Sequence, residues 1–243
     1  GTLYTVTPSA ASSYLVRITN SPCATVTSAP AVTVTVSPAP VAGTANTTTP
    51  TGCVGGTAPV ITLTGASAVI VGWEFSTDQT TWTSIGFAGS SAISADNSLV
   101  GDRWYRAEVR DLLNVCTHVK SNMVKITIAP VPTATLTGSA TICAGSSTVL
   151  TAAFTNTIAS SVYEISDDNG ATWTTVTGTT YTVTPSTTRN YFVRITNSPC
   201  ATVTSAPAVT VTVSPAPVAG TATANTPTGC VGVTAPVRPV RES

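Results

Sequence analysis

Residues 189–213 read RNYFVRITNSPCATVTSAPAVTVTV, and the end of this stretch decides the fold. Val209, Val211 and Val213 alternate there with threonines, which is the pattern of a β-strand that buries one face. Three stretches of the chain share this alternation: residues 32–36, 124–128 and 209–213. Each is followed at once by two prolines, which cannot donate to a sheet and favour an extended connection. We interpret each stretch as the last strand of a module followed by a linker.

The same stretch belongs to a long internal repeat. Residues 16–45 recur without change at residues 193–222, and residues 1–60 match residues 178–237 with ten differences. Matching positions are 177 residues apart throughout, as Cys23 and Cys200 are. A repeat this close indicates a tandem array.

The linkers divide the array into two kinds of module. We predict a module A at residues 41–130 and a module B at residues 131–217, so that the repeating unit is A plus B. Residues 1–40 correspond to the C-terminal part of another B module, and residues 218–243 to the N-terminal part of another A module. We therefore expect the chain to be part of a longer array.

Strand patterns recur about every ten residues inside each module, and no helical periodicity accompanies them. In module A the predicted strands are Val60–Leu63, Val69–Phe75, Trp82–Ile85, Trp104–Arg110 and Met123–Ile128. In module B they are Ala134–Leu136, Thr148–Ala152, Val162–Ile165, Trp173–Val176, Tyr181–Thr184, Tyr191–Thr196 and Ala208–Val213. This spacing predicts an all-β fold of tandem immunoglobulin-like β-sandwich modules, joined as beads on a string into a semi-rigid rod.

Modules A and B are also distantly similar to each other. Residues 73–75 align with residues 163–165, and Trp82 aligns with Trp173. Tyr105, Ala107 and Val109 align with Tyr191, Val193 and Ile195. The aligned positions are the alternating apolar ones, as expected for two members of one domain family.

The composition excludes several classes of protein. Hydrophobic residues make up 42% of the chain, which is enough to form cores, but only 8% of residues are charged. Ten basic and ten acidic residues leave a net charge of zero, which argues against nucleic acid as a partner. No apolar run approaches the 18 or so residues of a membrane span, so we expect no membrane insertion.

Each complete module has two cysteines, one before its early strands and one after its tyrosine-containing strand. We predict the disulfides Cys53 to Cys116 and Cys143 to Cys200, and hence an oxidising, extracellular compartment. Each loop closed this way would stabilise its module by about 4 kcal/mol in the chain-entropy model.

Two further cysteines, Cys23 and Cys230, each lack a partner in their own part of the repeat. We interpret them as marks of a continuing array, because they belong to unlike modules. A bridge between Cys23 and Cys230, or pairing between molecules, is the alternative.

Residues 166–173 read SDDNGATW, which fits the Asp-box pattern S-x-D-x-G-x-T-W of hairpin turns. We interpret the motif as turn chemistry, because Asp and Asn bond to turn backbones and Gly supplies a positive φ. Module A has a shorter version at residues 76–82, without the glycine. The residues of the predicted hairpin are Ser166, Asp168, Gly170, Thr172 and Trp173.

Other chemistry is conceivable for these residues. Asp167 and Asp168 could hold Ca²⁺, although a site needs six or more oxygens. The four tryptophans could form a platform for sugars, but two of them occupy matching positions in both modules and are better explained by packing.

We expect no enzyme activity and no cofactor or metal. His118 is the single histidine, which leaves most general-base schemes without a base, and we place it in a surface loop. The sequence has no CxxC zinc pattern, no phosphate-binding glycine loop and no nucleophile elbow.

The Asp-box hairpin, the Tyr-x-Val-x-Ile strand before Asn197-Ser198-Pro199-Cys200, and the Thr/Val closing strand resemble the immunoglobulin-like repeats of large Bacteroidota surface adhesins of the SprB gliding-motility type. That resemblance implies type IX secretion, a cell-surface location, and long filaments that touch a substratum. As partners we expect neighbouring repeats of the same chain, like filaments and a surface polysaccharide.

Together these observations predict a structural stalk segment of a repetitive cell-surface adhesin. The alternatives are a glycan-binding Asp-box module and an accessory domain of a secreted hydrolase. An Asp-box sialidase would need many more boxes and an arginine cluster around the sugar carboxylate, and arginines are few here.

Overall fold

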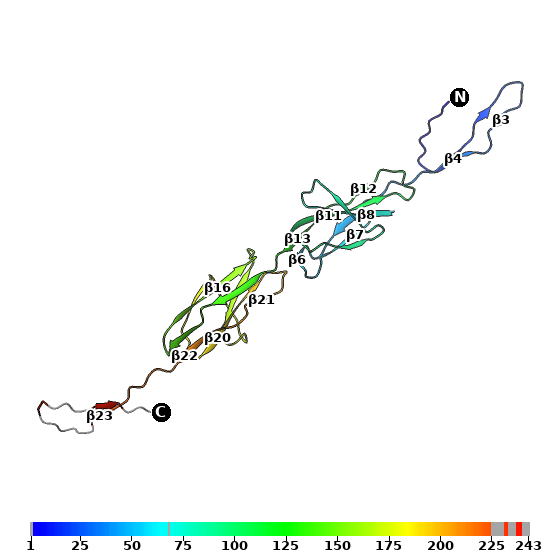
Figure 1. Cartoon of the computed structure of the whole chain (residues 1–243). Coiled ribbons are helices and arrows are strands. Elements are labelled where there is room, and N and C mark those ends of the chain that lie inside the picture. Colours follow the sequence, from blue (N-terminus) through cyan, green and yellow to red (C-terminus); the bar gives the residue numbers. More distant parts are fainter. Residues whose placement is uncertain (1, 68, 225–230, 233–236, 240–243) are drawn as a thin grey trace. The chain divides into compact units, whose positions relative to one another are not determined.

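The structure, a computed structural model, describes residues 2–67, 69–224, 231–232 and 237–239 (Figure 1). Contacts divide the chain into two units, Gly1–Val131 and Pro132–Ser243, which we treat separately. Every regular element within the described residues is a β-strand. Cys230 and most of the predicted C-terminal part-module lie outside the described residues.

Module A is a sandwich of two sheets. The smaller sheet has the order β10 (Ala92–Ser94), β7 (Val60–Thr64) and β5 (Thr44–Asn46). The larger sheet has the order β6 (Thr51–Cys53), β13 (Val124–Ala129), β11 (Gly101–Arg110), β8 (Val69–Ser76) and β9 (Thr83–Gly86), and β12 (Val119–Lys120) also pairs with β11. Neighbouring strands are antiparallel except for β6 and β13, which are parallel.

Module B repeats this topology in the second unit. Its smaller sheet is β14 (Thr133–Thr137), β16 (Thr148–Thr155) and β19 (Thr180–Val183). Its larger sheet is β15 (Ala140–Cys143), β22 (Val209–Ser214), β20 (Arg189–Thr196), β17 (Val162–Ser166) and β18 (Thr174–Thr175), with β21 (Val203–Thr204) beside β20. The prediction of tandem immunoglobulin-like β-sandwiches is confirmed, and the predicted strands are present in both modules.

The alternating apolar residues form one core in each module. In module A, Trp73, Tyr105 and Ile126 are among the side chains buried between the sheets. In module B, Leu136 and Leu150 of the smaller sheet meet Val193, Ile195 and Val211 of the larger one. The threonines between these positions face outward, which is how a strand separates its two faces.

The N-terminal segment, residues 2–40, forms two short antiparallel pairs. Strand β1 (Ser12–Tyr14) pairs with β4 (Val32–Val34), and β2 (Arg17–Ile18) pairs with β3 (Val26–Thr27). At the other end of the chain, β23 (Ala222–Ala224) pairs with β24 (Val237–Pro239).

The chain begins and ends each module at opposite ends of its sandwich. In module A, Ala45 exchanges hydrogen bonds with the Asn122 side chain, just before β13, while Cys53 lies beside Ala129 at the far end of β13. In module B, β14 lies against β21, which precedes β22, and Cys143 lies beside Ser214 at the end of β22. We call these the N-terminal and C-terminal ends of a module.

Candidate functional site

The Asp-box residues of module B meet in one turn between β17 and β18. The Asp168 carboxylate accepts hydrogen bonds from the Ser166 hydroxyl (2.7 Å), the Thr172 amide (2.9 Å) and the Thr172 hydroxyl (2.5 Å). The Gly170 amide donates to Ser166 Oγ (2.9 Å), and Trp173 Nε1 donates to the Gly170 carbonyl (3.1 Å). The turn thus uses both carboxylate oxygens of Asp168 for its own closure.

The hydrogen bonds of this turn favour the ionised form of Asp168. Hydrogen bonds from the Thr172 side chain and amide, and from Ser166, lower the pKa of the Asp168 carboxyl to about 2. Asp167 has a different role, since its carboxylate forms an ion pair with Arg189 at 2.9 Å. The two carboxylates that could hold Ca²⁺ thus have different partners, Asp168 within the turn and Asp167 in the ion pair with Arg189.

Module A closes the same kind of turn with one residue less. The Asp78 carboxylate accepts from Ser76 Oγ (2.9 Å) and from the amides of Thr80 (2.8 Å) and Thr81 (2.7 Å). Gln79 takes the positive φ of 64° and accepts the Trp82 indole hydrogen bond through its carbonyl. The two turns share the hydrogen bonds of their Ser, Asp and Trp side chains, although module A has no glycine there. These three residues therefore define the turn.

Each hairpin tryptophan is stacked against an arginine of the tyrosine-containing strand. The Arg106 guanidinium carbon lies 3.7 Å from the centroid of the Trp82 ring, and that of Arg194 lies 4.3 Å from the Trp173 ring. Arg106 also bonds to Glu74 (2.8 Å), while Arg194 bonds to Glu164. One face of each indole is therefore occupied by a cation, which removes that face from stacking with a sugar.

The charges around Arg106 form a cross-strand network on the outer face of module A. Glu74 also receives Lys120 at 2.8 Å, and Lys120 bridges to Glu108, which bonds to His118. Burial raises the pKa of Glu74, but the hydrogen bonds and charges of Lys120 and Arg106 outweigh it and leave that pKa below its usual value. His118 lies on the surface and bonds to Glu108 and Asn114.

The remaining tryptophans do not complete a platform. Trp73 is fully buried and donates its indole hydrogen to the Ser90 carbonyl (2.9 Å). Trp104 is partly exposed on β11, with Lys125 Nζ 5.6 Å from its ring centroid.

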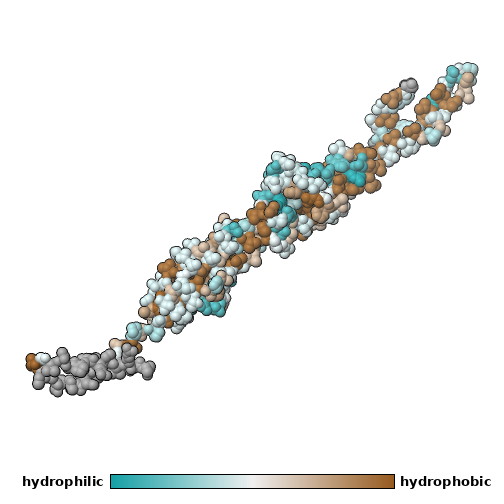
Figure 2. Space-filling model, in the orientation of Figure 1, coloured by the Kyte–Doolittle hydropathy of each residue, from teal (hydrophilic) through white to brown (hydrophobic). Residues whose placement is uncertain are grey.

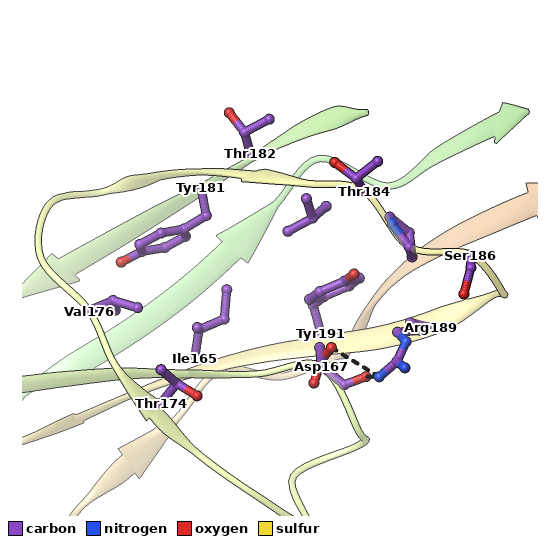
Figure 3. Close-up of a pocket in the computed structure, with 12 residues that line it drawn as sticks. Ile165, Asp167, Thr174, Val176, Tyr181, Thr182, Thr184, Ser186, Arg189 and Tyr191 are labelled. Atoms are coloured by element: carbon purple, nitrogen blue, oxygen red, sulfur yellow. Dashed lines mark hydrogen bonds and ion pairs between the residues drawn. The ribbon is translucent and has the colours of Figure 1, made fainter. Parts of the chain in front are cut away.

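Module B has an open cavity of about 640 Å³ between the edges of its two sheets (Figure 3). Tyr181 and Val183 of β19 form one wall, and Ile165 and Tyr191 form the other. The Asp167–Arg189 ion pair lies at its rim, as Figure 3 shows. Threonine hydroxyls line the opening, so the cavity is mixed in polarity. Burial raises the pKa of Tyr191, which keeps its phenol protonated.

Neither predicted disulfide pairing is present. Cys116 and Cys143 have free thiols, whereas Cys53 and Cys200 are disulfide-bonded. Cys23 also has a free thiol and is exposed. The pairings Cys53 to Cys116 and Cys143 to Cys200 are therefore corrected by the structure.

The strand directions explain the correction. Cys53 lies beside Ala129 at the C-terminal end of module A, where β11 begins, because Gly101 pairs with Ile128. Cys116 follows the end of β11 and lies at the other end of the sheet. Strand β11 spans roughly 30 Å at about 3.4 Å per residue, far beyond the reach of a disulfide. In module B, Cys143 and Cys200 are separated in the same way by β20.

Two buried polar residues that had not been singled out organise the loop after the tyrosine strand. The Asp111 carboxylate of module A accepts from the amides of Leu113, Val115 and Cys116. Burial raises its pKa, but hydrogen bonds, those from the Ser37 side chain and these three amides among them, outweigh burial and leave the pKa at about 2. The matching Asn197 of module B accepts from Ser161 and donates to the Asn156 carbonyl. Their common position, two residues after the last buried apolar residue of the strand (Val109 and Ile195), is the sequence signal that could have identified them.

Within the described part of the chain, no three His, Cys, Asp or Glu side chains are grouped so that they could hold a metal ion. The described residues also contain no helix that is long and apolar enough to cross a membrane.

The chain is similar to known β-sandwich structures and matches one protein family. Among solved structures, the chain is similar to fibronectin(III)-like modules of Clostridium thermocellum CbhA, at 13% identity and TM-score 0.34, covering 70% of this chain and 94% of that chain. It is also similar to a marsupial T cell receptor, at 12% identity and TM-score 0.31, covering 76% of this chain and 77% of that chain. No curated protein matches the sequence. A family model described as "Domain of unknown function (DUF8696)" matches residues 41–130 and again 133–215, so the chain belongs to that family.

Proposed function

We propose that this chain is a stalk segment of a repetitive cell-surface adhesin, in which modules A and B extend the chain away from the cell. The modules themselves are immunoglobulin-like structural domains. No reaction is assigned to them, and the partners we propose are neighbouring repeats and a surface polysaccharide.

The observation that carries this proposal is the placement of each module's termini. Ala45 is bound to Asn122 at one end of β13, and Ala129 is at the other end. The seven steps from Asn122 to Ala129 correspond to roughly 23 Å at about 3.3 Å per residue. A domain built this way adds its length to the chain instead of folding the chain back.

The polar groups that modules A and B share also support a structural role, because they bond within their own module. The Asp-box carboxylates close their own turns, and the hairpin tryptophans are stacked on arginines. The outward threonines suit exposure to solvent outside the cell. The resemblance to Bacteroidota adhesin repeats supports the location at the cell surface.

The experiment uses antibodies against this segment on intact cells of the source organism. We expect labelling of intact cells and release of the epitope by external protease. An in-frame deletion of A–B units from the full gene should reduce attachment while leaving export unchanged. Labelling only after lysis, or attachment that is insensitive to the number of units, would contradict the proposal.

Glycan binding is a second candidate, favoured by the cavity of module B alone. Tyrosine rings beside threonine hydroxyls and an ion pair are groups that sugars use. Saturation-transfer NMR with neutral and acidic monosaccharides tests it, with Tyr181→Ala as the variant that should lose the signal. Equal signals for both proteins would exclude binding in this cavity.

A further inference from the structure

Two of the free cysteines, Cys116 and Cys143, lie at opposite ends of their modules. Cys116 follows β11 at the N-terminal end of module A, and Cys143 is the last residue of β15 at the C-terminal end of module B. The thiol of Cys143 is exposed, and that of Cys116 is half-buried. Where a module A follows a module B, the end that contains Cys143 therefore precedes the end that contains the Cys116 position.

Both cysteines contact the same serine of the repeat. Cys143 pairs with Ser214 across the parallel strands β15 and β22, and the Ala144 amide donates to the Ser214 carbonyl at 3.1 Å. In the first unit, Cys116 Sγ lies 3.9 Å from the Ser37 carbonyl oxygen. Ser37 and Ser214 are 177 residues apart and lie in identical sequence. A module B followed by a module A therefore has both cysteines beside one serine.

The two contacts are compatible at a single serine. A carbonyl oxygen accepts two hydrogen bonds, so it can bond to the amide after Cys143 and to the weakly donating Cys116 thiol together. The loop with Cys116 is also fixed, because the Asp111 carboxylate accepts from the Cys116 amide at 2.9 Å. Neighbouring strands lie about 4.8 Å apart, and disulfides join Cα atoms about 4.4 to 6.8 Å apart. Two cysteines that adjoin one serine are thus separated on the scale of a disulfide.

Disulfide-bonded cysteines occupy the matching positions of the other module type. Cys53 lies beside Ala129 at the end of β13, as Cys143 lies at the end of β22. Cys200 follows β20 as Cys116 follows β11. Both Cys53 and Cys200 are disulfide-bonded. Each of the two module ends is therefore a place where a cysteine of this fold forms a disulfide.

We propose that Cys143 forms a disulfide with the residue equivalent to Cys116 in the module A that follows it, and so joins successive A–B units. Each thiol loses a proton, a sulfur–sulfur bond forms, and two electrons pass to an oxidising disulfide, which is released as two thiols. The bond would cross the two-proline linker and restrict bending there. This inference rests on the order of the modules and not on the adhesin role, so either can fail without the other.

The exposure of the two thiols fits this reaction. Cys143 is exposed, so its thiolate can attack the oxidant first and form a mixed disulfide. Figure 2 shows hydrophilic and pale residues over much of the visible surface of the modules, which a water-soluble oxidant can approach. The half-buried thiol equivalent to Cys116 then attacks the mixed disulfide and releases the remaining thiol.

The test uses a chain extended by one A–B unit, in which residues 1–217 are followed directly by residues 41–217. Val41 then follows Pro217 in place of the identical Val218. The reduced thiols are treated with oxidised glutathione, and the protein is alkylated and digested for mass mapping. We expect a cross-linked peptide pair that contains Cys143 and Cys116, whereas the unaltered chain should yield no such pair.

Serine variants of single copies identify which cysteines are joined. Cys143→Ser in the first unit, or Cys116→Ser in the second unit, should abolish the cross-link. The matched controls are Cys116→Ser in the first unit and Cys143→Ser in the second, and both should leave the cross-link unchanged. Protection of Cys53 and Cys200 from alkylation before reduction shows that the modules of each variant are folded.

Three results would overturn the proposal: free thiols at both positions after oxidation, a cross-link that survives the first two variants, or a bond from Cys143 to a different cysteine. Non-reducing electrophoresis gives a further check, since the expected bond lies within one chain. Disulfide-linked pairs of chains in place of a cross-linked monomer would assign these thiols to contacts between filaments and would also overturn it.

Discussion

The central carbon of the Arg106 guanidinium lies 3.7 Å from the centroid of the Trp82 ring, while Arg106 Nε bonds to Glu74 at 2.8 Å. One arginine thus joins two strands and a turn: β11, which contains it, β8 through Glu74, and the turn before β9 through Trp82. Arg194, Glu164 and Trp173 repeat the arrangement in module B.

Replacing Arg106 by alanine should destabilise module A by about 1 to 2 kcal/mol, the sum expected for a cation–π contact and a partly exposed ion pair. Thermal unfolding followed by tryptophan emission measures it. Lys125→Ala is the control, since Lys125 is half exposed and 5.6 Å from its ring, and it should change stability by under about 0.5 kcal/mol. Equal effects of the two variants would show that the stack adds nothing.

Acid should weaken module B through Asp168. Its pKa is about 2 in the folded chain, below the ordinary aspartate value of about 4. The folded state therefore prefers the ionised form, so the stabilisation is complete above pH 4 or so and is lost as the pH falls towards about 2. Unfolding midpoints measured across this range should fall less steeply for Asp168→Asn than for the unaltered chain. Parallel pH profiles would assign the acid sensitivity to other groups.

Alkylating agents should distinguish the free cysteines from the disulfide-bonded ones. Alkylation without reduction should modify Cys23, Cys116 and Cys143 and leave Cys53 and Cys200 protected until a reductant is added. Peptide mass mapping of the two samples gives the answer directly. Recovery of a Cys143–Cys200 or Cys53–Cys116 cross-linked peptide would contradict the strand directions described above.

Gly138 tests the close approach of strands in module B. Its φ is +116°, and a Cβ there would lie 2.7 Å from the Val149 carbonyl oxygen. Gly138→Ala should cost about 2 to 4 kcal/mol, because backbone strain and a backbone clash add together. Gly178→Ala is the control: φ is +80° but nothing lies within 4 Å, so only strain of about 1 kcal/mol is expected. Similar losses for both variants would rule out the clash.

The alternation of valine and threonine was sufficient to predict the long strands and the sandwich, because period-two burial is directly visible in sequence. The short strands β5, β6, β10, β12, β15 and β21 were missed, since two to four residues give too little pattern. The two predicted cysteine pairings were wrong. Spacing along the chain does not reveal that the short parallel strand β6 takes Cys53 to the end of the sheet opposite Cys116.

The sequence also did not determine the register in which β8 pairs with β11 and β17 pairs with β20. The aligned residues Trp73 and Tyr163 do not take the same place, because Ala107 lies opposite Trp73 whereas Val193 lies opposite Ile165. A slip of two residues preserves which face each side chain occupies, so the apolar pattern cannot distinguish the two registers. The ion pairs show the same shift: Arg106, opposite Glu74, is one residue after Tyr105, whereas Arg194, opposite Glu164, is three residues after Tyr191.

Small-angle X-ray scattering of a length series tests most directly the claim that these modules extend the chain. The series compares this chain with versions that contain one and two additional copies of residues 41–217. If each module begins and ends at opposite ends of its sandwich, every added A–B unit should lengthen the maximum dimension by roughly 50 to 80 Å, from two modules of about seven to ten strand residues each plus linkers. A maximum dimension that grows only as expected for a compact particle of rising mass would contradict the account.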